Sequence, residues 1–163
     1  MKKLTVICMA FLAVLMMASC QGPKGDPGNA NVTSYTLTVS PNDWYWDNTS
    51  WRFDIRYEAI TSDISERGAV LVYMEDRGTW RQIPMTFYYS NANGNLFSSS
   101  LEVSSYENGV SIFWTENDFY DQYRPEQHRF KIVVIAASYY QARPDVDYSN
   151  YETVKSTFQI IEK

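Results

Sequence analysis

The sequence predicts an all-β fold, an antiparallel β-sandwich of Ig-like architecture with one short C-terminal helix. Two observations support this prediction. Eight short segments show the alternating or continuous apolar pattern of β-strands. Turn signals rich in Gly, Asn, Asp and Pro separate these segments about every dozen residues, as in sandwiches and barrels. A small up-and-down β-barrel is the alternative arrangement of such strands.

Two strands are predicted in the first third of the domain. In residues 32–40, Tyr35, Leu37 and Val39 alternate with threonines, and a Pro-Asn-Asp turn ends the segment. Residues 51–59 alternate more regularly still, since apolar side chains occupy every second position and charged ones lie between them. Such a strand has one buried face and one wet face, as is common in antiparallel sheets.

The next predicted elements form a hairpin. A polar connection at 61–68 leads to the apolar run 69–74, which is typical of a central strand. A turn at 75–78 returns the chain as the hairpin partner, residues 79–89. Pro84 lies within that partner and cannot donate a ladder hydrogen bond, so we expect an edge strand or a bulge there.

The second half of the domain continues with short elements. Residues 130–137 form the most hydrophobic segment and are predicted at the centre of a sheet. A polar, aromatic-rich loop at 116–126 precedes this strand. The other predicted elements are turns at 91–95 and 107–109, strands at 97–103, 110–114 and 157–161, and a short helix opened by a capping box at 149–152.

The chain begins with a pattern typical of a secretory signal peptide. Lys2 and Lys3 precede the uncharged apolar run 4–17, and small residues then lead to Cys20. The apolar run is too short for a stable membrane span. Residues 15–20 resemble the lipobox of bacterial lipoproteins, with Met in place of the usual Leu three residues before the cysteine. The resemblance implies cleavage before Cys20 and attachment of lipid to it.

The segment after Cys20 resembles collagen in composition and phase. Glycine occupies positions 22, 25 and 28, which gives two Gly-X-Y triplets. Two triplets are too few to register three chains, so we expect a stiff Pro/Gly spacer. The chain is therefore divided into a signal peptide (1–19), a lipidated cysteine with a collagen-like tether (20–31), and a β-sandwich domain (32–163).

Segments near both ends resemble small lipoproteins of the Bacteroidetes type. These proteins carry a short collagen-like tract after the lipidated cysteine and a C-terminal β-rich domain of unknown function. The similar segments are residues 20–32, 130–135 and 146–155. The resemblance implies a lipid anchor in the outer membrane and no particular activity. Residues 21–24 lack the acidic pair of surface-exported lipoproteins, so the periplasmic side is favoured over the cell surface.

Composition argues against several classes of function. A net charge of −5 repels phosphate backbones, so we expect no nucleic-acid partner. Cys8 leaves with the signal and Cys20 is consumed by lipid, so neither a disulfide nor a catalytic thiol remains. The only histidine, His128, has no nucleophile motif to pair with and cannot alone build a zinc site. The acidic loop 117–121 does not match an EF-hand. We expect no enzyme, metal or cofactor.

The aromatic run 44–46 suggests a ligand site. At the strand period of two, Trp44 and Trp46 share a face, and Asp43 and Asp47 flank them. Flat indoles beside carboxylates suit a sugar ring, so these four residues are the predicted binding site. The alternative is that the tryptophans plug and cover one end of the sandwich. Three further tryptophans are assigned to the core: Trp51, Trp80 and Trp114.

The sequence leaves two functions open. One is a non-catalytic module that binds a glycan or peptide through the site at 43–47. The other is a structural or assembly lipoprotein whose partner is another envelope protein, for which exposed strand edges would serve. In both cases the lipid at Cys20 makes the membrane a partner.

Overall fold

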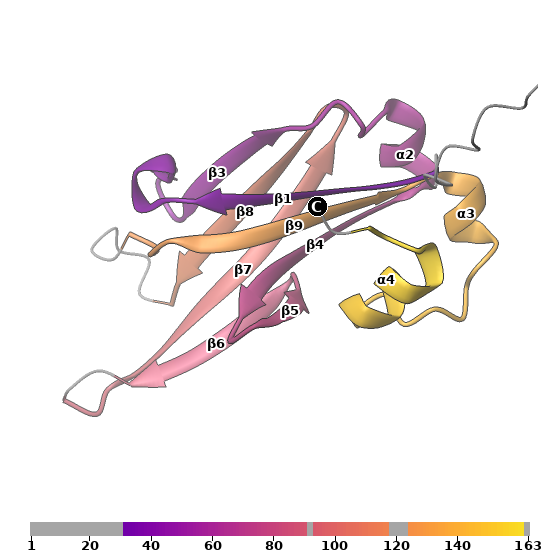
Figure 1. Cartoon of the computed structure of the whole chain (residues 1–163). Coiled ribbons are helices and arrows are strands. Elements are labelled where there is room, and N and C mark those ends of the chain that lie inside the picture. Colours follow the sequence, from indigo (N-terminus) through magenta and orange to yellow (C-terminus); the bar gives the residue numbers. More distant parts are fainter. Residues whose placement is uncertain (1–30, 91–92, 118–123, 162–163) are drawn as a thin grey trace, which may run out of the picture.

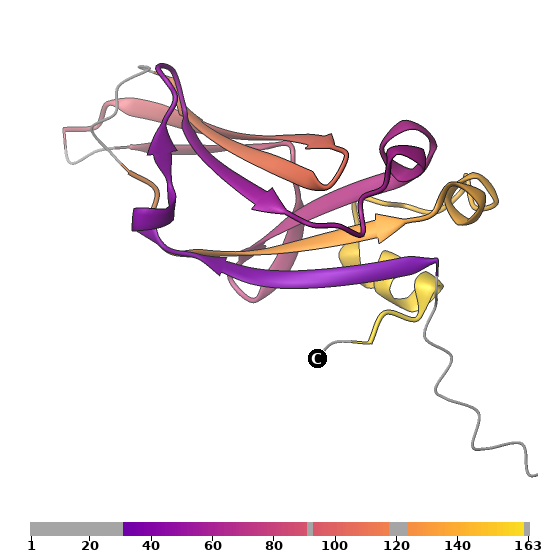
Figure 2. The ribbon, with the colours of Figure 1, turned by 90° about the horizontal axis from the view of Figure 1, so that it is seen from above.

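The computed structural model describes residues 31–90, 93–117 and 124–161. Two antiparallel sheets lie face to face, and helices cover the outer face of one of them (Figures 1 and 2). The prediction of an all-β sandwich is confirmed, and the barrel alternative is wrong because the described strands form two open sheets. The predicted signal peptide, Cys20 and tether lie outside the described residues.

Each sheet has a simple order of strands. The four-stranded sheet consists, in spatial order, of β1 (Val32–Val39), β9 (His128–Ile135), β4 (Ala69–Asp76) and β5 (Thr79–Gln82). The five-stranded sheet consists of β2 (Tyr45–Trp46), β3 (Trp51–Arg56), β8 (Gly109–Glu116), β7 (Leu96–Tyr106) and β6 (Met85–Ser90). The helical elements are η1 (Pro41–Asp43), α2 (Ser62–Arg67), α3 (Ala137–Gln141) and α4 (Tyr151–Phe158).

The most hydrophobic strand, β9, lies between β1 and β4, as predicted. Its alternating residues face two separate cores. Phe130 and Ile132 point into the space between the sheets, whereas Val133 and Ile135 point outward against the C-terminal helices. A strand buried on both faces has no need of polar residues, and this explains its nearly continuous apolar run.

The predicted hairpin partner at 79–89 is two strands rather than one. The chain changes sheets at Pro84: β5 pairs with β4, and β6 pairs with β7 in the opposite sheet. Both strands are sheet edges. Pro84 has no N–H to donate, so a ladder cannot continue through it, and the edge position expected from this residue is confirmed.

The predicted final strand at 157–161 is wrong. Residues 157 and 158 belong to α4, which ends where Gln159 adopts a left-handed φ of 52°. Tyr151, Val154 and Phe158 share one helical face, and packing this face against the four-stranded sheet forms the second core. Tertiary burial therefore outweighs the β-propensity of the Thr-Phe-Gln-Ile segment.

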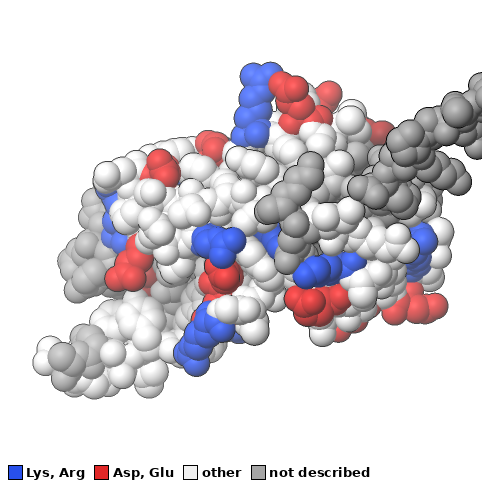
Figure 3. Space-filling view, in the orientation of Figure 1, with Lys and Arg blue, Asp and Glu red and all other residues white. Residues whose placement is uncertain are grey.

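Charged side chains are interspersed on the surface. On the face shown in Figure 3, basic and acidic groups lie beside one another. The ion pairs include Arg67 with Asp63 and Arg81 with Asp76. Within the described ranges, no helix is long and apolar enough to cross a membrane.

Candidate functional site

The structure places Trp44 in the core between the sheets. Its side chain is only 2% exposed. The indole packs edge-on or tilted against the rings of Phe53, Trp114 and Phe130, at centroid distances of 6.0, 6.4 and 6.1 Å. Trp44 therefore has no ring face that a ligand could contact, and it plugs the sandwich as the alternative reading described.

The other three residues of the predicted site have local structural contacts. Trp46 is half-buried and packs edge-on against Trp51, 5.5 Å away. The carboxylate of Asp43 accepts a hydrogen bond of 2.7 Å from the backbone N–H of Ser40, which caps η1. Asp47 lies 3.6 Å from Arg52. Because η1 turns the chain into the core directly after Asp43, these residues form no common surface of exposed indoles and carboxylates.

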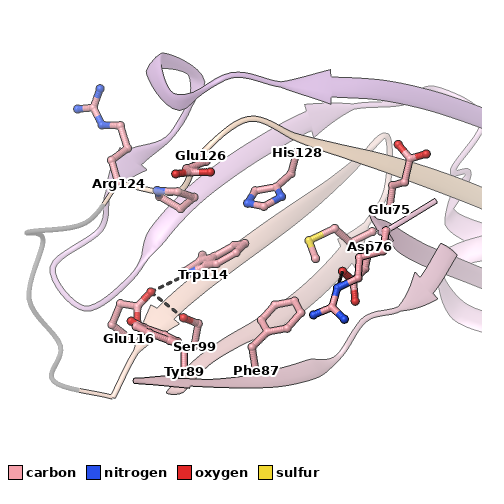
Figure 4. A pocket seen from close by; sticks show the side chains of 13 residues that line it. Glu75, Asp76, Phe87, Tyr89, Ser99, Trp114, Glu116, Arg124, Glu126 and His128 are labelled. Carbon is pink, nitrogen blue, oxygen red and sulfur yellow. Dashed lines mark hydrogen bonds and ion pairs between the residues drawn. The ribbon is translucent and has the colours of Figure 1, made fainter. Parts of the chain in front are cut away.

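A cavity of about 400 Å³ lies between the two sheets at one end of the sandwich. Its walls come from the ends of β4, β6, β7, β8 and β9 and from residues 124–126 (Figure 4). The inward-facing residues of β8 explain why the wall of the cavity is partly polar. Val110 and Ile112 are buried in the core and Trp114 packs half-buried against it, but the next residue in the alternation is Glu116. A carboxylate therefore occupies an inward position at the end of the strand.

Three rings form a stack along one wall of the cavity. Trp114 stacks on His128 at a centroid distance of 4.9 Å and an angle of 23°. It also stacks on Phe87 at 5.9 Å and 26°. The three side chains come from β8, β9 and β6, so both sheets contribute. Because Trp114 is held by two neighbours, its orientation is set before any ligand binds.

The Trp114 indole directs its N–H at Glu116. The Oε1 atom of Glu116 accepts hydrogen bonds from Trp114 Nε1 at 2.8 Å and from Ser99 Oγ at 2.8 Å, and Oε2 accepts one from the Tyr89 hydroxyl. Glu116 is only 7% exposed. An acceptor bonded by three donors is the arrangement of an ionised carboxylate. Among the described residues, no cationic side chain lies within 4.0 Å of it.

His128 presents a neutral imidazole to the same cavity. Burial lowers the pKa of His128 below its ordinary value, although the nearby charge of Glu126 opposes this effect. The ring is therefore neutral at pH 7, with one nitrogen as donor and the other as acceptor. In the part of the chain that the structure describes, neither nitrogen has a hydrogen-bond partner, so both are available to a ligand.

The arginines around the cavity are engaged elsewhere. Arg124 donates a hydrogen bond to Asn42 and lies over the Trp51 ring at 4.9 Å, and Figure 4 shows its guanidinium pointing away from Glu116. Arg129 pairs with Glu75 at 2.8 Å. Asp76 is likewise paired, with Arg77 and Arg81. Among the described residues, none of these guanidinium groups forms an ion pair with Glu116.

Sequence reasoning missed this site for a definite reason. The sequence pattern assigns Trp114 to the core, against which it packs half-buried, but it gives no connection between Trp114 and His128. The available signal was Glu116, an acidic residue in phase with the inward apolar positions of its strand. The partners Tyr89 and Ser99 carry no signal of their own, since isolated Tyr and Ser residues are common on strands.

The comparisons with known proteins found no match. No family model matches the chain, and no curated protein or solved structure resembles it significantly. Among the described residues, no three His, Cys, Asp or Glu side chains lie together in a group that could hold a metal ion. The expectation that the acidic loop 117–121 binds no calcium stays untested, because Asp118 and Asp121 lie outside those residues.

Proposed function

We propose that the chain is a lipid-anchored cell-envelope lipoprotein whose non-catalytic β-sandwich binds a small glycan unit in the end cavity. One observation carries the binding proposal. The cavity brings a clamped ring stack of Phe87, Trp114 and His128 together with the buried carboxylate of Glu116. Apolar walls with a few convergent polar groups are typical of small-molecule sites.

The chemistry of the walls suits a saccharide. Sugar rings present apolar C–H groups, which pack on aromatic side chains, and hydroxyl groups, which need donors and acceptors. The neutral imidazole of His128 offers one donor and one acceptor. Glu126 adds an exposed carboxylate at the mouth. A volume of about 400 Å³ lies in the range of pockets that enclose small ligands.

The position of the cavity supports display from an anchor. Val32 pairs with Ile135 at one end of β1, whereas Val39 pairs with His128 at the other end. Eight strand residues, roughly 26 Å, therefore separate the entry of the tether from the cavity. A domain held at Val32 by a lipid on Cys20 directs the cavity away from the membrane.

The anchor is tested by labelling. We expect the protein to take up labelled palmitate and to fractionate with the outer membrane, facing the periplasm. A Cys20→Ala variant loses the label, because no thiol remains for the lipid. A Cys20→Ala protein that still incorporates palmitate contradicts the proposal, and a Cys8→Ala variant is the matched control, since that residue leaves with the signal peptide.

Ligand binding is tested on the lipidated protein in a polyoxyethylene detergent, which carries neither sugar nor charge. The NMR signals of the single histidine report on the cavity during titration with a panel of disaccharides. We expect saturable shifts, and a His128→Leu variant followed by tryptophan fluorescence should bind about tenfold more weakly, because hydrogen bonds to the imidazole are lost. Tyr88→Leu is the control. Tyr88 lies on β6 and is 78% exposed, so this variant should bind normally. Failure of every disaccharide overturns this function.

A second candidate function has an observation of its own. The hairpin of β6 and β7 extends beyond the body of the sandwich (Figure 1), and it exposes 78% of Tyr88 and 74% of Leu96. Exposed apolar residues beside a free sheet edge suit another envelope protein. Co-purification of a partner that is lost in Tyr88→Ser but retained in His128→Leu would support this assembly role.

A further inference from the structure

Glu116 is a buried carboxylate whose partners are all neutral. Its hydrogen bonds come from an indole, a serine hydroxyl and a tyrosine hydroxyl. Hydrogen bonds from neutral groups offset part of the cost of burying a charge, and a cation offsets more. The two oxygens have about four acceptor sites, of which the described residues use three. Oε2 therefore retains one site for a donor from outside the chain.

The chain itself does not supply the missing cation in the described region. Arg124 points away toward Asn42 and Trp51, and Arg129 is paired with Glu75. Glu126 at the mouth also has no ion pair with a described residue. Two carboxylates thus face the cavity without a counter-ion, one at its inner wall and one at its entrance.

The ring stack is already occupied by neighbours within the chain. Trp114 stacks on both His128 and Phe87, and Arg81 lies over the Phe87 ring at 5.7 Å. The ammonium preference therefore rests on the carboxylates. His128 adds no opposing positive charge at pH 7, since burial keeps it neutral. Two carboxylates and an uncharged imidazole together form a setting that recognises an ammonium group.

We infer that the cavity selects a saccharide unit with a free ammonium group, an amino sugar whose nitrogen is not acylated. This inference rests on the proposed glycan-binding function and specifies its ligand class. The ammonium group donates to Glu116, and Glu126 attracts it at the entrance. The sugar hydroxyls are served by His128, whose nitrogens accept and donate one hydrogen bond each.

Three disaccharides with the same β-1,4 backbone test the inference. Diglucosamine carries ammonium groups, diacetylchitobiose carries acetamides and cellobiose carries hydroxyls at the same position. Titrations use the lipidated protein at 0.15 M salt, where long-range attraction to the acidic chain is screened. We expect diglucosamine to bind about tenfold more tightly than either of the others, as a charge-assisted hydrogen bond predicts.

Variants assign that preference to the cavity. Glu116→Gln should remove most of the preference for diglucosamine, and Glu126→Gln, at an exposed residue that leaves the fold intact, should reduce it by about threefold. Glu102→Gln removes the same charge from an exposed position on β7 outside the cavity and should change nothing. A preference that survives in both cavity variants overturns the inference, whether or not Glu116→Gln is destabilised.

The ligand series separates the possible failures. Equal binding of the three disaccharides overturns the ammonium preference and leaves glycan binding in place. Binding of none of them overturns the proposed function itself. Nα-acetyl-lysine amide tests the charge without the sugar. If it binds as tightly as diglucosamine, the cavity recognises an amine and not an amino sugar, and the saccharide assignment is wrong.

Discussion

Glu116 interrupts the inward apolar pattern of the sandwich and supplies the buried carboxylate of the cavity. It occupies an inward position of β8 that would otherwise hold an apolar side chain. Burial of a polar group costs free energy unless hydrogen bonds satisfy it, and here three donors from β6, β7 and β8 do so. Proteins place polar residues at inward strand positions mainly at functional sites. Glu116 is therefore stronger evidence for a binding site than an exposed aromatic residue is.

His128 provides a pH-dependent test of the cavity. Burial lowers its pKa below the ordinary 6.5, so the folded protein binds the proton less readily than the unfolded chain. The free energy of unfolding should therefore be highest above pH 6.5, should fall as the pH drops below it, and should level off below the pKa of the folded state. NMR titration of this single histidine should give a midpoint below 6.5.

The stability measurement has a matched control. In His128→Asn the imidazole is absent, so the part of the pH dependence near 6.5 should disappear from urea unfolding curves. A folded-state midpoint at or above 6.5 would show that the ring is solvated and that the cavity is more open than the structure indicates.

Trp44 should behave as a core residue and not as a ligand platform. Trp44→Ala should lower the free energy of unfolding by about 3–5 kcal/mol, because a large side chain leaves the space between the sheets. Trp44→Phe should cost less, since it retains a ring and removes an indole N–H that has no partner among the described residues. Urea unfolding measures both values. A loss below 1 kcal/mol in the alanine variant would contradict the core position of Trp44 and make it a candidate binding residue again.

At the scale of elements, Pro84 marks a change of sheet. It lies between the end of β5 in one sheet and the start of β6 in the other. The change of sheet brings Phe87 and Tyr89 of β6 to the same cavity as Met74 to Asp76 of β4. A continuous hairpin over residues 79–89 would have kept both aromatic side chains on the four-stranded sheet, and Glu116 would have lacked its tyrosine donor.

Two neighbouring residues, Ser149 and Asn150, are candidates for the N-cap of α4. The sequence pattern at 149–152 suggested Ser149, but the side chain of Asn150 accepts the hydrogen bond from the backbone N–H of Thr153 at 3.2 Å. Asn150→Ala should therefore lower stability by about 1 kcal/mol. Ser149→Ala removes only an exposed bond to Asp147 and should stay within about 0.5 kcal/mol. Equal losses in thermal or urea unfolding would contradict this assignment.

At the scale of the whole molecule, two cores hold three layers together. One core joins the two sheets, and the other joins the four-stranded sheet to α4 and its flanking segments (Figure 2). β9 contributes to both, so it ties the helical layer to the sandwich. The cavity lies at the end of the first core remote from Val32, where β9 begins and β8 ends. This arrangement suits a protein tethered at one end and proposed to bind at the other.

Much of this fold follows from local pattern alone. The alternation of apolar residues in 32–39 and 51–56, the continuous run of β9 and the turn residues between strands predict an antiparallel sandwich, because side chains alternate faces with a period of two. The lipobox-like N-terminus predicts an anchor independently of the fold. Pro84 predicts a sheet edge because it lacks an N–H.

The tertiary structure alone decided where the proposed ligand site lies. A period of two assigns each residue to a face but does not say which faces meet. The sequence therefore could not show which of Trp44 and Glu116 is the better candidate for a binding residue. Packing of the sheets buried the aromatic residue and gave the acidic one three donors from separate strands. Contacts between residues as distant in sequence as Phe87, Trp114 and His128 depend on the order of the strands. That order is set by the total burial of both cores and not by any local segment.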